Sequence, residues 1–352
     1  MLRRISVTAL FAGLASLAIM VWSGSSSAQE MQLAATASPA ANAASANPLQ
    51  NNASVPASGN SNNGTHATLE LGGGWESDPA RQTPDTGPDW LGLAHADVTD
   101  LRDFWDTQWR SEAQVTGDYY AAQGAYNYAY AGGTFGPVLY VNPDIRVHPD
   151  FGLATSLYSD HWFYNEASGG VAVETDYFNS DQALRFRFGC REYNEHVFPA
   201  TKGCFGEITG QVTYTDVVKS GDVFNLSPEF RHSNIGGTGF TGSPQFEAVQ
   251  AGKYDEIGGK ADYYVPLSGS VVLGGGFSLQ HTQYSSVSNP TTGVAAGRRD
   301  LLYGPTASVI LENFFGKNRD WRFDYAYDIN QSTSAIDAFS DHTLTTSVVM
   351  RF

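Results

Sequence analysis

The chain has 352 residues and a formal net charge of −16, with 36 acidic residues against 20 basic ones. This balance argues against a nucleic-acid-binding protein, because phosphate contacts require clustered Lys and Arg. Beyond residue 22 no apolar run approaches the ~20 residues that a membrane helix needs. If the chain spans a membrane, it therefore has to do so as strands.

Residues 1–28 have the organisation of a secretory signal peptide. Arg3 and Arg4 form a basic beginning, residues 5–22 are almost wholly apolar or small, and Ser26-Ser27-Ala28 supplies the small residues that signal peptidase requires. A single membrane anchor is the alternative, but the Ala-, Gly- and Ser-rich core favours a cleaved peptide. Its removal takes the net charge from −16 to −18, because the two arginines leave with it.

Residues 29–66 form a separate segment dominated by Ala, Asn, Ser and Pro, with Glu30 as its only formal charge. Such a stretch buries too little apolar surface to offset its ordering entropy, so we expect a disordered periplasmic leader. The alternative is a segment that docks on a periplasmic partner or partly plugs a lumen.

From Ala67 to Phe352 the sequence alternates with a period of two. The sharpest example is 321–330, in which odd positions are aromatic or aliphatic and even positions are charged, small or amide. Successive side chains of a strand point to opposite faces, so this pattern predicts strands with one apolar and one polar face. The end of the chain, 343–352, repeats the pattern.

A soluble β-sandwich would alternate as well, but three features favour a barrel in a membrane. The apolar rows are rich in aromatics and the polar rows in charges and amides, as in barrels with lipid outside and water inside. A membrane excludes open sheet edges, so the sheet has to close. The chain also ends inside a strand at Phe352, which resembles the terminal aromatic assembly signal of outer-membrane barrels. We therefore predict an all-β fold, a transmembrane antiparallel up-and-down β-barrel over 67–352 in a Gram-negative outer membrane.

The alternation predicts about fourteen strands, with twelve and sixteen left open. We place them at 67–76, 88–98, 110–130, 133–147, 151–163, 168–178, 181–190, 204–216, 221–233, 245–265, 269–283, 299–314, 320–330 and 343–352. Short turns at one end should alternate with long loops at the other. The expected short turns are His148-Pro149-Asp150, Asn179-Ser180, 217–220, 266–268 and 315–319. The expected long loops are 77–87, 191–203, 234–244, 284–298 and 331–342.

Cys190 and Cys204 are the two cysteines of the chain, and in an exported protein we expect them to form a disulfide. On the chain-entropy model such a bridge contributes about 3 kcal/mol for a loop near 15 residues. They lack histidine partners at metal-ligand spacing, and the acidic segment 76–106 lacks the spacing of a calcium loop. We expect no metal and no cofactor.

The polar row of each strand should line the lumen. The charged lining candidates are Glu174, Asp176, Arg185, Arg187, Glu229, Arg231, Arg322, Asp324, Asp328 and Arg351. The negative balance of the chain would favour cations over anions in a pore. The alternative is that these residues pair across strands and only stabilise the wall. Aromatic residues of the inner row, such as Tyr264 and Phe178, would suit a sugar chain that slides through by stacking.

Two short segments invite an enzymatic interpretation. Arg231-His232-Ser233-Asn234 faintly resembles the H-x-S-N segment of lipid A deacylases. Those hydrolases need His and Ser on one face of a strand, but adjacent strand residues face opposite ways. Ser159-Asp160-His161 fails similarly, because a catalytic triad is defined by geometry rather than by sequence proximity. We therefore expect no enzyme and no catalytic residue, and keep a lipid hydrolase as a minor alternative.

Two other segments resemble the barrel domain of surface lipoprotein assembly modifiers and related export channels. Leu71 to Pro79 is similar to their Gly-rich opening strand and its turn. Their closing hairpin is similar to Arg322 through Tyr325 with Tyr327, Asn330, Ser332, His342 and Phe352. The resemblance implies a barrel and a transport theme, without the helical repeats that recruit cargo in that group.

Together these observations predict a channel for a hydrophilic solute or an exported polymer such as a polysaccharide. The main alternative is a barrel with an occluded lumen that acts in surface assembly, display or adhesion. The expected partners are outer-membrane lipid and lipopolysaccharide, the barrel assembly machinery, and a periplasmic export or synthesis protein.

Overall fold

The computed structural model describes residues 64–79, 87–158, 161–177, 180–193, 202–218, 221–233, 254–288, 295–335 and 337–352. All of them belong to one compact unit, Ala35–Phe352. The predicted signal peptide 1–28, and the predicted leader as far as residue 63, lie outside the described residues. No helix in the described ranges is both long and apolar enough to cross a membrane.

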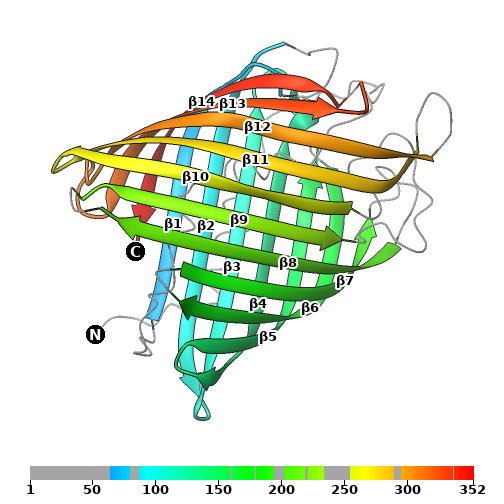
Figure 1. Ribbon diagram of the computed structural model, residues 1–352, viewed down its shortest axis with the longest axis vertical. Helices are drawn as coiled ribbons and strands as arrows, with labels where there is room; N and C mark the ends of the chain where they lie inside the picture. Colours follow the sequence, from blue (N-terminus) through cyan, green and yellow to red (C-terminus); the bar gives the residue numbers. More distant parts are fainter. Residues whose placement is uncertain are drawn as a thin grey trace. The chain divides into compact units, whose positions relative to one another are not determined.

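Within the described residues, fourteen strands form a single closed antiparallel barrel, as the alternation predicted (Figure 1). Each strand pairs with its neighbours in the chain, and β1 pairs with β14 to close the sheet. The strands are β1 (Gly64–Glu76), β2 (Asp89–Phe104), β3 (Thr107–Tyr120), β4 (Tyr128–Asn142), β5 (Ile145–Tyr158), β6 (His161–Tyr177), β7 (Ser180–Tyr193), β8 (Lys202–Val217), β9 (Val223–Ser233), β10 (Tyr254–Ser268), β11 (Val271–Ser288), β12 (Ala295–Leu311), β13 (Arg319–Ser332) and β14 (Phe339–Arg351). A short 3-10 turn, η2 (Gly124–Tyr126), lies between β3 and β4.

Connections differ between the two ends of the barrel. At one end, here named the short-turn end, lie 105–106, 143–144, 178–179, 218–222, 269–270 and 312–318. The other end, here named the loop end, carries the longest connections, 77–88 and 234–253. This alternation agrees with the prediction, but strands extend into the expected loops 191–203, 284–298 and 331–342, so those bounds are wrong. The expected loops 77–87, 191–203, 234–244 and 284–298 also lie wholly or partly outside the described residues.

The inner face of the wall is identified by side chains that bridge unpaired strands. Arg110 on β3 donates to Glu174 on β6, and Arg185 on β7 donates to Asp150 on β5. Side chains of strands that do not pair with each other come within hydrogen-bonding distance only on the concave side of the curved sheet. Directly paired residues share a face, so the register assigns every strand residue to the inner or the outer face.

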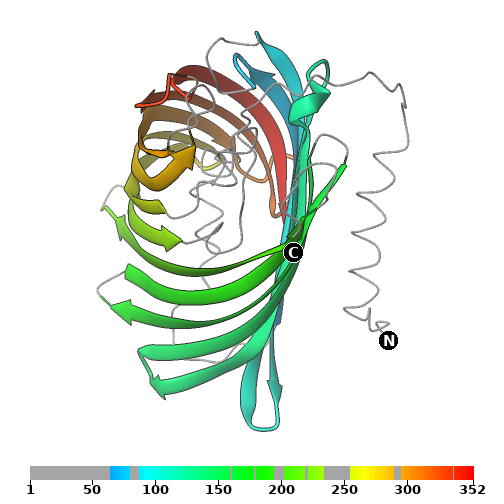
Figure 2. The ribbon, with the colours of Figure 1, turned by 90° about the vertical axis from the view of Figure 1, so that its right-hand side faces the viewer.

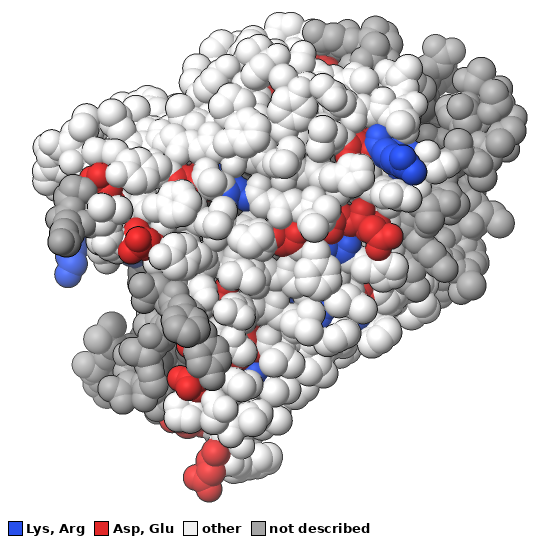
Figure 3. Space-filling model, viewed as in Figure 1, with Lys and Arg blue, Asp and Glu red and all other residues white. Residues whose placement is uncertain are grey.

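The outer face carries large apolar side chains that are exposed. Aromatic residues gather near both ends of this face. They include Trp90 and Tyr119 toward the loop end, and Phe104, Trp105, Phe314 and Phe315 toward the short-turn end. Between them lie exposed aliphatic and aromatic residues such as Leu153, Phe188, Ile257 and Leu279. The face seen in Figure 3 is accordingly largely uncharged.

The predicted turn at His148-Pro149-Asp150 is wrong, because these residues lie within β5. Proline has no N–H to donate to a ladder. The strand tolerates Pro149 because the β4–β5 ladder is interrupted there, between Phe135↔Phe151 and Leu139↔Val147. The turn itself comes earlier, at 143–144. Similar gaps in one ladder accompany Pro228 in β9 and Pro305 in β12.

The boundaries predicted around 98–133 are also wrong. β2 continues to Phe104, and the chain reverses at Trp105 and Asp106, whose φ values are 51° and 58°. A two-residue hairpin of this kind usually contains Asn-Gly, so the sequence holds no turn signal here. Figure 2 shows this hairpin reaching beyond the neighbouring strands. The predicted strand 110–130 is broken at 121–127.

Candidate functional site

The inner face of the barrel wall is the candidate site. The register places every charged lining candidate on this face: Glu174, Asp176, Arg185, Arg187, Glu229, Arg231, Arg322, Asp324, Asp328 and Arg351. Most of them also take part in ion pairs with other inner-face residues. Most of these residues therefore brace the wall from its inner face, and that they line an open lumen stays a prediction.

A dense network lies near the short-turn end, across β3, β5 and β6. The Arg110 guanidinium donates to Glu174 through Nη2 at 2.6 Å and lies 3.2 Å from Glu112. Arg146 lies 3.4 Å from Glu174 and donates to Asp176 at 3.1 Å. These short contacts join strands that are far apart in the sequence, so the network braces the curvature of the wall.

His148 lies at the centre of this network and is almost fully buried. Its Nδ1 is 2.6 Å from Nη2 of Arg110, and its Nε2 has no hydrogen-bond partner in the described part of the chain. Because Arg110 can only donate, the geometry requires an unprotonated Nδ1. His148 thus acts as a neutral acceptor in the wall.

A guanidinium–aromatic cluster lies nearer the loop end. The Phe205 ring is covered by Arg187 at 5.0 Å and by Arg191 at 5.2 Å, and Arg191 also lies 4.4 Å from the Tyr164 ring. Both arginines bind the buried carboxylate of Glu166, at 3.3 and 2.8 Å. The aromatic faces and the shared carboxylate hold the two guanidinium groups in fixed positions.

On the opposite part of the wall, Arg298 binds Asp300 at 2.5 Å and Asp337 at 2.8 Å, and its guanidinium lies 4.8 Å from the Tyr284 ring. Asp337 belongs to the connection between β13 and β14. Burial raises the pKa of its carboxyl, and the Arg298 charge opposes that shift. The ion pair therefore tethers this connection to the wall.

β9 carries two exposed charged residues on the inner face, Glu229 and Arg231. From Pro228 to His232 every residue is exposed, whichever face it occupies. Arg231 is 46% exposed, and its ion pair, from Nε to Glu207, is long at 3.8 Å. Glu229 has no hydrogen bond or ion pair with any residue in the described ranges. Most other inner-face charges are more deeply buried and more tightly paired, as Arg322 is.

The sequence interpretation missed several inner-face residues: Arg110, Arg146, His148, Asp150, Glu166, Arg191, Phe205, Glu207, Glu256 and Arg298. The same alternation signal would have found Arg191, Phe205 and Glu207, because they continue the rows of predicted strands. His148 and Asp150 were hidden by the false turn at Pro149.

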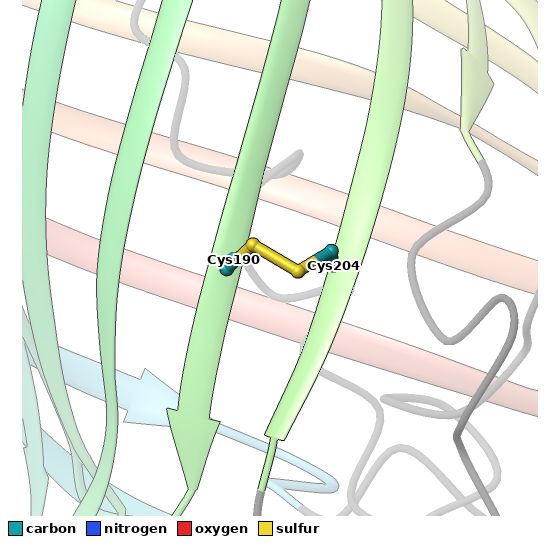
Figure 4. The surroundings of a disulfide bond; sticks show 2 residues. All are labelled: Cys190 and Cys204. Atoms are coloured by element: carbon teal, nitrogen blue, oxygen red, sulfur yellow. A yellow bond between two sulfur atoms is a disulfide. The ribbon is translucent and has the colours of Figure 1, made fainter.

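Cys190 and Cys204 form the predicted disulfide (Figure 4). They are directly opposite each other on β7 and β8. Their side chains lie on the outer face, in the row of Phe186 and Phe188. The bond therefore links two strands already joined by the ladder, rather than only closing the loop between them.

The residues of the hydrolase interpretation do not come together. His232 lies on the outer face, with its Nδ1 2.6 Å from Asp255. Ser233 lies on the inner face and is fully buried. Ser159 and Asp160 lie outside the described residues.

The two aromatic residues expected to stack on a sugar chain are Phe178 and Tyr264. Phe178 lies outside the described residues. Tyr264 does lie on the inner face, but it is buried rather than open to a solute. Within the described ranges no group of three His, Cys, Asp or Glu residues is arranged to hold a metal ion.

The segments that resemble assembly modifiers meet at the seam where the barrel closes. Ser77 donates to Asp341 at 2.8 Å, and the His342 amide donates to Ser77. The His342 ring stacks on Tyr327 at 4.3 Å. These contacts join the end of β1 to β14 and β13 where the barrel closes, and no comparison shows a relationship to that group.

Comparison with known proteins assigns no family. No family model matches the chain, and no curated protein matches it. OccAB3 of Acinetobacter baumannii is 9% identical with a TM-score of 0.37, and the match covers 82% of this chain and 99% of OccAB3. OpdK of Pseudomonas aeruginosa, solved with vanillate, is 8% identical with a TM-score of 0.36, covering 82% and 98%. The outer membrane protein Omp33 of Acinetobacter baumannii is 11% identical with a TM-score of 0.38, covering 82% and 99%. Because these identities and TM-scores are low, the fold is established by the strand pairing of this chain and not by the comparisons.

Proposed function

We propose that the barrel spans a Gram-negative outer membrane and forms a channel for small hydrophilic solutes, with a preference for cations. The observation that carries the proposal is the charge of the inner face. Among the described strand residues of that face, acidic side chains outnumber basic ones. Fixed negative charge along a narrow aqueous path attracts cations and repels anions.

The outer face supports the membrane-spanning part of the proposal. Exposed apolar residues between two sets of aromatic residues match the apolar band of outer-membrane barrels, which is about 25 Å tall. A closed sheet leaves no unpaired edge, as the hydrocarbon region requires. Export by a signal peptide and insertion by the barrel assembly machinery are further parts of the proposal.

Reversal-potential measurements test the proposal. The purified mature protein is inserted into a planar bilayer under a KCl gradient, and we expect discrete openings with a reversal potential on the cation-selective side. Asp97→Asn removes a 41%-exposed carboxylate of the inner face, so it should shift the potential toward anions. Asp255→Asn removes a 73%-exposed carboxylate of the outer face and serves as the matched control, with no shift expected.

The other functions raised by the sequence predict different results. An occluded barrel for display or adhesion would give no openings. A polymer exporter would conduct salt but would also be blocked by added polysaccharide. A lipid hydrolase would release fatty acid from lipopolysaccharide, and the separation of His232 from Ser233 across the wall speaks against that chemistry.

A further inference from the structure

We infer that Glu229 and Arg231 on β9 form a binding subsite for a small zwitterionic solute that carries one carboxylate and one ammonium group, as an α-amino acid does. The inference rests on the proposed channel function, because the solute has to reach the inner face.

The first argument is accessibility. Most inner-face charges are half-buried or buried, but Glu229 and Arg231 are both exposed. Directly opposite Glu229 lies Gly258 of β10, which offers no side chain. A Cβ at that position would lie 2.7 Å from the Leu279 carbonyl oxygen, so the backbone excludes a side chain opposite Glu229.

The second argument is unsatisfied charge. Glu229 has no hydrogen bond or ion pair with any described residue. Arg231 has a side-chain hydrogen bond with Tyr254 and one long ion pair, 3.8 Å to Glu207, and Glu207 lies closer to Arg187, at 3.3 Å. Arg231 therefore competes with Arg187 for one carboxylate and retains donor capacity for a ligand.

The third argument is spacing. The two residues are separated by one position, so they share a face and their Cα atoms lie about 7 Å apart along the strand. They nevertheless make no ion pair with each other. A ligand that brings a carboxylate to the guanidinium and an ammonium to the Glu229 carboxylate would satisfy both at once. A simple anion or cation would satisfy only one.

The neighbouring rows agree with a small polar ligand. Thr209 on β8 and Glu256 on β10 flank Arg231 directly, and Gln211 flanks Glu229. Glu256 already accepts hydrogen bonds from Gln280 and Thr282, at 2.8 and 3.3 Å. The ammonium group of the ligand would therefore bind Glu229, whose carboxylate oxygens accept no hydrogen bond from the described part of the chain.

Ligand-observed NMR on the detergent-solubilised mature protein tests the inference without relying on conductance. L-alanine is the probe, and propionate and ethylamine are its two halves, each lacking one charged group. We expect alanine to bind about tenfold more tightly than either half, as one charge-assisted hydrogen-bonded contact implies. Glu229→Gln should reduce alanine binding to the level of propionate, and Arg231→Gln to the level of ethylamine.

Matched controls come from the same inner face. Asp324→Asn removes a 33%-exposed carboxylate and Arg351→Gln a 43%-exposed guanidinium, and both should leave alanine binding unchanged. If Arg231→Gln does not yield a heat-modifiable barrel, Arg231→Lys keeps the charge and should weaken binding without abolishing it. Equal binding of alanine, propionate and ethylamine would overturn the inference, as would loss of binding in the control variants.

The two proposals fail separately. Openings in the bilayer without specific alanine binding would retain the channel and remove the subsite. Specific alanine binding that is lost with Glu229→Gln, in a barrel that gives no openings, would retain the subsite and remove the channel.

Discussion

Arg191 and Phe205 face each other on the inside of the barrel, one residue after the disulfide that joins Cys190 and Cys204 on the outside. The disulfide and the cation–π contact therefore join β7 to β8 at the same level of the barrel, one on the outer face and the other on the inner face.

Removing the disulfide should weaken the barrel without preventing its formation. In the double variant Cys190→Ser/Cys204→Ser, the β7–β8 ladder from Ser180 to Glu192 remains to set the register. We expect the free energy of unfolding to fall by about 3 kcal/mol, as the closed loop implies. Urea unfolding in lipid, followed by tryptophan fluorescence under non-reducing conditions, measures it. A variant that never forms a heat-modifiable band would contradict this account.

The closing seam depends on an inward-facing glycine. A Cβ at Gly72 of β1 would lie 2.7 Å from the Ser347 Cβ and 2.9 Å from its Cα. Gly72→Ala should therefore separate β1 from β14 and slow or abolish folding into bilayers. Gly92→Ala on β2 is the matched control, because a Cβ there meets nothing within 4 Å. The yield of heat-resistant barrel on gels compares the two, and equal yields would exclude a tight seam.

The buried network around Arg110 should contribute far more to stability than a surface ion pair. Arg110→Leu leaves the Glu174 carboxylate buried beside Arg146 alone, and breaking such a pair costs about 3–5 kcal/mol. Arg102 is the control, since its side chain is 64% exposed while it pairs with Asp100. Arg102→Gln should cost less than about 1 kcal/mol. Both values come from equilibrium unfolding in lipid.

The assignment of faces can be tested with one arginine at two adjacent positions of β11. Leu279→Arg places a charge on the outer face, where Leu279 is exposed. Arginine against the bilayer midplane costs about 2–4 kcal/mol. Gln280→Arg places the same group on the inner face, beside the Glu256 carboxylate, and should be tolerated. If the two variants unfold at the same denaturant concentration, the assignment of faces is wrong.

Much of the fold could be predicted from alternation alone. The pattern at 321–330 assigns Arg322, Asp324 and Asp328 to one face with no knowledge of neighbouring strands, because side-chain direction is a local property of a strand. Strand number followed from counting such segments between turns. The inner row was therefore accessible to sequence reasoning wherever the strand boundaries were correct.

The rest depends on geometry that no local pattern contains. The sequence predicts a turn at Pro149 because a missing N–H normally ends pairing, whereas the barrel places this residue at an interruption in one ladder. The reversal at Trp105 uses residues that rarely adopt positive φ. The contact of Arg110 on β3 with Glu174 on β6 passes over two intervening strands, so it follows from the curvature of the closed wall rather than from either segment.

The strict two-residue register has a consequence for how this sequence can change over time. A single residue inserted near the beginning of β9 would turn Glu229 and Arg231 toward the outside and bring Phe230 and His232 inward, so one codon would exchange the two faces of the strand that follows it. Substitutions can adjust one face at a time, whereas an insertion inside a ladder keeps the faces only if a β-bulge absorbs it, as the register shifts in four of the ladders do. Length variation among descendants of this chain should therefore concentrate in segments such as 77–88 and 234–253, where new residues shift no ladder.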